Sequence, residues 1–283
     1  MFYKYKEVNL HYQVIGEGKP VLLLHGMCCD MGLMKGCMEP VFEKKGGYRR
    51  IYLDLPGMGK STAPREYASA DKILEILGAF VREIIQERFL IAGESYGGYL
   101  ARGVLERFYD RVDGLLLICP VVIPDHERRD VPQTDLKFVE EGFLDRPEAA
   151  KRREFLVSSV IADEQVFGRF QKEIQPGLQA ADEEFTGILE KNYAFSRDID
   201  KEIRTISFQK PVLFVCGRQD TCVGYRDLWG LLEDYPRATY GVLDTAGHNL
   251  QIEQPGLFEA LAKEWLARTE VYDGSGNTTS SPR

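Results

Sequence analysis

The chain has 283 residues, of which 44% are hydrophobic and 11% aromatic, so it can bury the core of one large domain or two small ones. Its formal net charge of −8, with a pI near 5.2, disfavours a nucleic-acid partner, because binding to phosphates needs clustered lysine and arginine. The longest apolar runs are about half a membrane span and the N-terminus lacks an apolar signal segment, so we expect a cytoplasmic protein with no membrane partner.

The first half of the chain alternates strand and helix patterns. Polar–apolar alternation predicts two antiparallel strands at residues 2–7 and 9–14. Continuous apolar runs predict buried strands at 21–24, 50–54, 89–92 and 112–119. Apolar residues at helical spacing predict helices at 37–45, 70–86 and 99–106, with a loop at 27–36.

The pattern changes between residues 124 and 209. This stretch has no buried-strand run and is too long for a loop inside a compact domain. Amphipathic segments recur in it, at 135–141, 147–161, 163–174 and 183–192. We therefore expect a helical cap at 124–209, inserted between two strands and lying over the carboxyl ends of the sheet.

Alternation resumes after the predicted cap. Strands are expected at 211–217 and 238–243, and helices at 225–235 and 255–268. The polar tail at 272–283 is expected to be disordered. The whole pattern predicts an α/β protein with a mostly parallel, doubly wound sheet, whose core comprises residues 1–123 and 210–271.

The residues Gly93-Glu94-Ser95-Tyr96-Gly97 lie between a predicted strand and a predicted helix. Gly-x-Ser-x-Gly in this context is typical of a nucleophile elbow, in which a strained turn exposes the serine oxygen beyond the sheet. The two glycines meet the demand for small residues on both sides of such a turn. Ser95 is therefore the predicted nucleophile.

A serine nucleophile needs a base, and the chain has four histidines. His248 follows the last predicted strand, at the same end of the sheet as Ser95, and is the predicted base. His25, which ends a strand beside Gly26, is the alternative base. Its position there favours a structural role, in which the ring braces the following loop. His11 and His126 lie in a hairpin and in a charged stretch, where solvated roles are expected.

The base in turn needs an acid to orient it. Asp220 follows the penultimate strand and lies between Ser95 and His248 in the chain, which is the order described for this motif. Asp125 and then Asp54 are the alternatives. Glu94 and Glu253 are candidates for tuning the site, but solvated or helix-terminal roles are favoured for both. The backbone N–H groups of Met27 and Tyr96 are the predicted oxyanion hole.

Neither a metal nor a cofactor is expected. The six cysteines form no Cys-x-x-Cys pair, lack short-spaced histidine partners and are expected to remain thiols in a reducing compartment. The segment Gly57-Met-Gly-Lys-Ser61 imitates the end of a phosphate loop, but the first glycine of that motif is replaced by Asp54.

These motifs occur in the order and spacing of the α/β-hydrolase superfamily, which the chain resembles over residues 20–270. The resemblance is carried by His25-Gly26, the 54–61 loop, the elbow, Gly217-x-x-Asp220 and Gly247-His248. It implies a Ser95–His248–Asp220 triad, an oxyanion hole from Met27 and Tyr96, and a helical cap over the pocket. Ser95 stands where epoxide hydrolases and haloalkane dehalogenases carry aspartate, which disfavours both activities.

The sequence thus favours a carboxylesterase-like serine hydrolase that cleaves a small ester or related acyl compound through an acyl-enzyme. Two alternatives remain open. The same triad supports hydrolysis of a carbon–carbon bond or a lyase step, and a hydrolase scaffold can also serve as a ligand-binding receptor. Most aromatic residues of the cap are expected to pack against the sheet or one another, and a few are expected to line an apolar pocket for a small-molecule substrate. The aromatic residues concerned are Phe138, Phe143, Phe155, Phe167, Phe170, Phe185, Tyr193 and Phe195.

Overall fold

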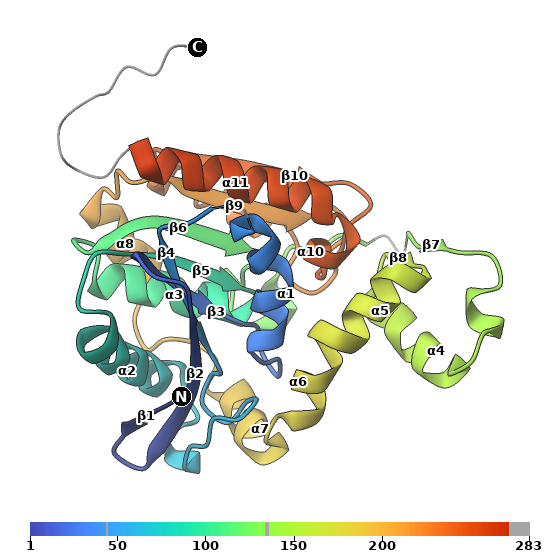
Figure 1. Ribbon diagram of the computed structural model, residues 1–283, viewed down its shortest axis with the longest axis horizontal. Helices are drawn as coiled ribbons and strands as arrows, with labels where there is room; N and C mark the ends of the chain where they lie inside the picture. The colour runs from blue at the N-terminus through green and yellow to red at the C-terminus, as the bar shows by residue number, and fades with distance from the viewer. Residues whose placement is uncertain (44, 134–135, 272–283) are drawn as a thin grey trace.

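The computed structural model describes residues 1–43, 45–133 and 136–271, and an eight-stranded sheet forms its centre (Figure 1). The strands lie in the order β1-β2-β4-β3-β5-β6-β9-β10. Their bounds are Phe2–Tyr5, Val8–Ile15, Tyr48–Leu53, Lys19–Leu24, Phe89–Glu94, Val112–Ile118, Val212–Gly217 and Ala238–Leu243, in that order. β2 is antiparallel to β1 and β4, and all neighbours from β4 to β10 are parallel. The predicted mostly parallel, doubly wound sheet is confirmed.

The central strands are buried on both faces. Every residue of β5, β6 and β9 is buried, and apart from Glu94 and Asp113 these residues are apolar or glycine, which is typical of strands covered on both faces. The parallel register pairs Leu24 with Gly93, Glu94 with Ile118, and Ile118 with Val215. The carboxyl ends of β3, β5, β6 and β9 therefore meet at one edge of the sheet, and the residues that follow them lie close together.

Helices cover both faces of this sheet (Figure 1). α1 and α11 pack together on one face, and α2, α3 and α8 pack together on the other. Their bounds are Met31–Phe42, Pro255–Val271, Ala70–Phe80, Tyr96–Arg107 and Ile199–Ile206, in that order. Within the described ranges, none of the helices has both the length and the apolar character that crossing a bilayer requires.

Three helices differ from their sequence predictions. α1 begins at Met31 and not at residue 37, because the Asp30 side chain accepts the Gly32 N–H at 2.7 Å and caps it. The helix predicted at 70–86 continues beyond α2 as a π-helical turn, Val81–Ile85. The helix predicted at 225–235 is divided into α9, Arg226–Trp229, and a 3-10 turn, Leu232–Asp234. The tail at 272–283 lies outside the described residues.

The segment between β6 and β9 is mainly helical, and its part at residues 138–173 extends away from the sheet (Figure 1). Its helices are α4 (Ala149–Ser158), α5 (Glu164–Glu173), α6 (Gln175–Ala180), α7 (Glu183–Lys191) and α8, with 3-10 turns at His126–Arg128 and Phe143–Asp145. The helical segment expected at 135–141 instead contains strand β7, Phe138–Val139, which pairs with β8, Ile161–Ala162. The Phe138 and Glu140 N–H groups donate to the carbonyls of Val160 and Ala162, so the backbone is paired without a helix.

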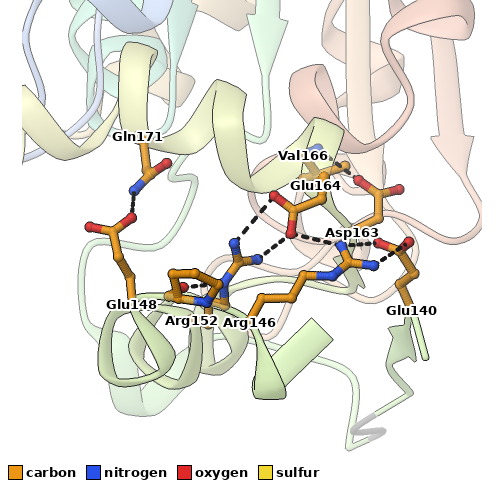
Figure 2. Close-up of polar contacts among 9 residues, drawn as sticks. Glu140, Arg146, Glu148, Arg152, Asp163, Glu164, Val166 and Gln171 are labelled. Carbon is orange, nitrogen blue, oxygen red and sulfur yellow. Dashed lines mark hydrogen bonds and ion pairs between the residues drawn. The ribbon is translucent and has the colours of Figure 1, made fainter. Parts of the chain in front are cut away.

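A buried arginine organises the outer part of this segment (Figure 2). Arg152 of α4 is 6% exposed, and its guanidinium carbon lies 4.6 Å from the Phe143 ring centroid and 4.5 Å from that of Phe167. It donates to the Pro147 carbonyl at 2.8 Å and to both Glu164 oxygens at 2.6 and 3.2 Å. The neighbouring polar pairs are Glu140 with Arg146, Glu148 with Gln171, and Asp163 with the N–H of Val166.

Replacing Arg152 with methionine is expected to destabilise this region by about 2 kcal/mol, because it removes a desolvated cation held between two aromatic rings. Urea unfolding followed by circular dichroism measures the change. Arg153→Met is the matched control, since Arg153 is adjacent, exposed and of equal charge. Equal stability of the two variants would show that the ring contacts of Arg152 contribute nothing.

Candidate active site

Ser95 lies in the turn between β5 and α3, in a backbone conformation that few residues adopt. Its φ of 51° and ψ of −116° place it in a strained region. A Cβ on Gly93 would lie 2.3 Å from the Gly97 carbonyl oxygen, and one on Gly97 would lie 2.3 Å from that of Leu24. Only glycine fits at both positions, which explains why the turn needs the Gly-x-Ser-x-Gly sequence.

The three side chains proposed as a triad from the sequence lie in one hydrogen-bonded chain. His248 Nε2 is 3.0 Å from Ser95 Oγ, and His248 Nδ1 is 2.9 Å from Asp220 Oδ2. The other carboxylate oxygen, Asp220 Oδ1, accepts the N–H groups of Cys222 and Val223 at 2.8 and 3.0 Å. These two bonds fix the carboxylate, so Oδ2 remains directed at the imidazole.

The electrostatics of this pair favour a charged carboxylate facing the ring. Burial opposes the charge of Asp220, but His248 and the two backbone N–H groups outweigh it and lower the pKa of that carboxyl below its usual value. Burial likewise opposes charge on His248, whereas the Asp220 carboxylate favours it, and the pKa of His248 is raised above its usual value. The pair is thus arranged to stabilise an imidazolium ion when Ser95 loses its proton.

The alternative acids and the alternative base considered from the sequence have other hydrogen-bond partners. Asp54 binds His11 Nδ1 at 2.8 Å and the Met31 N–H at 2.8 Å, and exposed Asp125 accepts the Glu127 N–H. His25 Nδ1 is 2.7 Å from the Gly26 carbonyl, and its Nε2 accepts the Leu55 N–H at 2.9 Å. His25 is therefore a brace between two loops.

Glu94 is a buried member of the site, which corrects the expectation of a solvated or helix-terminal role. It is 2% exposed, and its Oε1 lies 3.5 Å from His248 Nε2. A Cβ on Gly26 would lie 2.2 Å from Glu94 Oε2, so the carboxyl group sits against the loop that leads to Met27. Burial raises the pKa of Glu94 to about 7, although His248 acts in the opposite direction.

Replacing Glu94 with glutamine is expected to alter the pH dependence of turnover. The wild-type kcat/KM profile should contain an ionisation near pH 7 from Glu94, which is charged above that pH and neutral below it. Glutamine removes this ionisation and the attraction for the imidazolium, so the pKa of His248 should fall and activity should persist to lower pH.

Profiles measured from pH 5 to 9 test this, with exposed Glu17→Gln as the control of equal charge change. If the Glu94→Gln and wild-type profiles superimpose, Glu94 has no electrostatic influence on His248.

Glu253 ends helix α10, Leu250–Glu253, as the helix-terminal alternative expected, but it is buried and not solvated. It is 4% exposed and accepts the N–H groups of Gly247, Val160 and Ile161 at 2.6, 2.5 and 3.3 Å. Burial raises its pKa despite these three bonds. Glu253 thus joins the loop that carries His248 to the segment between β6 and β9. The residues adjacent to Glu253 in the sequence do not indicate that its side chain binds this distant segment.

A small cavity opens onto Ser95 and His248. Its volume is about 250 Å³, at the lower end for ligand pockets, and Met27 lies in its wall. Of the aromatic residues expected to form the pocket, Phe170 and Tyr193 line it. The rings of Phe143, Phe155 and Phe167 pack together within the segment between β6 and β9, as expected for most of the aromatic residues there.

One group of described residues has the composition of a metal site. Donor atoms of Cys119, Asp220 and His248 lie within 4.8 Å of one another. Burial raises the pKa of the Cys119 thiol, which disfavours the thiolate that a metal would need. The geometry of Asp220 and His248 is accounted for by their bond to each other and to Ser95.

Comparison with known proteins assigns the chain to a family. Residues 19–255 match the family model for the α/β-hydrolase fold, so the chain belongs to the α/β-hydrolase superfamily. The chain is 27% identical to 2-hydroxymuconate semialdehyde hydrolase of Pseudomonas putida over 279 residues, which cover 93% of this chain and 92% of that protein. It is 28% identical to pimeloyl-[acyl-carrier protein] methyl ester esterase of Nitrosomonas europaea over 256 residues, with 85% and 92% covered.

Solved structures agree with this assignment. An α/β superfamily hydrolase from Oenococcus oeni PSU-1 superimposes with a TM-score of 0.86 and 32% identity, covering 95% of this chain and 99% of that one. The resemblance drawn from the motifs is confirmed. The names of the relatives include both an esterase and a semialdehyde hydrolase, so they support a hydrolase without distinguishing the bond that is cleaved.

Proposed function

We propose that the protein is a serine hydrolase that cleaves a small ester or related acyl compound through an acyl-enzyme. The observation that carries the proposal is the continuous hydrogen-bonded chain from Ser95 through His248 to Asp220. A hydroxyl becomes a nucleophile when a base accepts its proton, and this base has a carboxylate that holds it in one tautomer.

In the proposed reaction, Ser95 Oγ attacks the substrate carbonyl while His248 Nε2 takes its proton. The backbone N–H groups of Met27 and Tyr96 stabilise the oxyanion that forms. His248 then gives the proton to the leaving group, and an acyl-enzyme on Ser95 remains. Water, activated by His248, releases the acid and restores the serine.

We further propose that residues 124–209 act as a cap over this site, with 1–123 and 210–271 as the hydrolase core. Phe170, Ile174, Leu178 and Tyr193 all come from the inserted segment, and all line the cavity that contains Ser95. An apolar wall of this kind suits a substrate with a short hydrocarbon group.

A second candidate is hydrolysis of a carbon–carbon bond by the same side chains. The observation in its favour is the similarity to a 2-hydroxymuconate semialdehyde hydrolase over 93% of the chain. In this reaction the same acid–base pair would assist attack on a ketone, and the leaving group would be a carbanion equivalent in place of an alkoxide.

Two substrate panels distinguish these candidates. Chromogenic esters of increasing acyl length and a set of vinylogous diones are supplied to the purified protein, and the products are identified by mass spectrometry. A fluorophosphonate probe in parallel should modify the peptide that contains Ser95. Turnover of short esters supports the esterase proposal, turnover of diones alone supports the second candidate, and absence of both turnover and labelling contradicts both.

A further inference from the structure

A single arginine lies in the wall of the cavity that contains Ser95. Arg129 follows the 3-10 turn after β6, and three backbone carbonyls hold its guanidinium in place. Nε donates to Ile123 at 2.8 Å, Nη1 to Cys222 at 3.1 Å, and Nη2 to Pro124 at 3.1 Å. Ile123 and Pro124 follow β6, whereas Cys222 follows β9. Because these contacts come from two separate segments, the guanidinium has a fixed position beside the cavity.

Within the described residues the Arg129 guanidinium forms no direct ion pair, and the Asp227 carboxyl interacts with it only at longer range. Across the ranges that the structure describes, no carboxylate lies within 4.0 Å of Arg129, although the chain has 44 acidic residues. Its three acceptors are neutral carbonyls. A guanidinium has five N–H donors, so one on each terminal nitrogen remains for a ligand. A half-buried cation with unused donors is stabilised by an anion that reaches it.

The other charged side chains of the cavity wall already have partners within the protein. His248 binds Ser95 and Asp220, and Glu94 lies against His248 and Gly26. The remaining surface includes the apolar side chains of Leu33, Val121 and Ile174. The cavity therefore has a nucleophile, a short apolar stretch and a guanidinium.

We propose that Arg129 is an anion subsite of the active site and that the substrate carries a carboxylate a few carbon atoms from the carbonyl that Ser95 attacks. The two unused N–H groups match the two oxygens of a carboxylate in a bidentate contact. The volume of about 250 Å³ keeps the separation short. This inference rests on the proposed hydrolase function and names its substrate class: half-esters of short dicarboxylic acids, or acyl compounds of the same shape.

The test compares monomethyl glutarate with methyl valerate, which have equal acyl chain length and differ in the terminal carboxylate. The wild-type enzyme should hydrolyse the half-ester with the higher kcat/KM, and sodium chloride should reduce that preference. Arg129→Met should lower the ratio of kcat/KM for monomethyl glutarate to that for methyl valerate by about 10- to 100-fold, mainly through the KM of the half-ester.

The adjacent residue provides the matched control. Arg128 is exposed, and Arg128→Met makes the same change in net charge without removing a group from the cavity wall. It should leave the ratio of the two kcat/KM values unchanged. A ratio that Arg129→Met does not alter, or that Arg128→Met alters equally, overturns the subsite.

Two outcomes separate this inference from the proposed function. Labelling of Ser95 and hydrolysis of methyl valerate without any preference for the half-ester would contradict the subsite alone. That comparison needs only the wild-type protein, so it decides the question even if Arg129→Met fails to fold. Absence of both labelling and hydrolysis would contradict the proposed function itself.

Discussion

Replacing Ser95 with alanine is expected to lower kcat by about 10⁶-fold and to abolish fluorophosphonate labelling. The hydroxyl is the group within 3.0 Å of His248 Nε2, and without it the imidazole has no proton to accept and the substrate carbonyl meets no nucleophile. The effect is large because, in the proposed reaction, the substrate can still bind in the cavity but no acyl-enzyme can form without the hydroxyl.

The alanine variant should fold normally, since it keeps both glycines of the turn and removes one hydroxyl, with a stability change of no more than about 1 kcal/mol. Activity on the preferred short ester, mass spectrometry of the labelled peptide and a thermal melt are measured together. Ser196→Ala changes an exposed serine and should match the wild type in all three. Labelling that persists in the Ser95→Ala protein would show that another residue is the nucleophile.

The elements nearest the site could be predicted because their signals are local. The buried runs at β3, β5 and β9 contain few polar residues, and the glycines around Ser95 are required by close backbone approaches of 2.3 Å. The positions of Asp220 and His248 followed from parallel topology, since residues after parallel strands meet at one edge.

The rest depended on contacts between distant segments. Glu94 and Glu253 are acidic residues, for which solvation is the usual expectation. Glu94 ends the buried strand β5 and packs against Gly26, and Glu253 binds the N–H groups of Gly247 and Val160. The arginine at 129 resembles its exposed neighbour Arg128, and its place in the cavity wall depends on the carbonyl of Cys222, which lies 93 positions further along the chain.

The short strands of the inserted segment could not be predicted from the sequence either. Phe138 and Val139 are exposed, so no buried face marks β7 in the sequence, and the strand exists because its backbone pairs with residues 160–162. Likewise α1 starts at Met31 with the cap at Asp30, and Met31, Met34 and Met38 already have helical spacing there, but two glycines within the first two turns obscure this pattern. Pattern-based prediction weighs side-chain periodicity and misses elements held by backbone pairing or caps.

The second large effect is expected for Asp220→Asn. Asp220 Oδ1 accepts two backbone N–H groups, so the asparagine carbonyl oxygen should occupy that position and its NH₂ group should face His248 Nδ1. Nδ1 must then accept a hydrogen bond, which moves the ring proton to Nε2. A protonated Nε2 cannot accept the Ser95 proton, and a comparable exchange in a serine protease lowers kcat by about 10⁴-fold.

Because asparagine keeps both bonds to the loop, the variant should lose turnover without losing thermal stability. Asp220→Ala removes the same bonds from Cys222 and Val223 and should melt at lower temperature, but it does not force the unproductive tautomer. The two variants therefore separate the roles of the carboxylate: asparagine reports on the proton at His248, and alanine reports on the loop.

Asp244→Asn, which changes an exposed carboxylate on the neighbouring loop, controls for the change in charge. An asparagine variant that retains a tenth or more of the wild-type kcat would mean that Asp220 does not set the tautomer of the base.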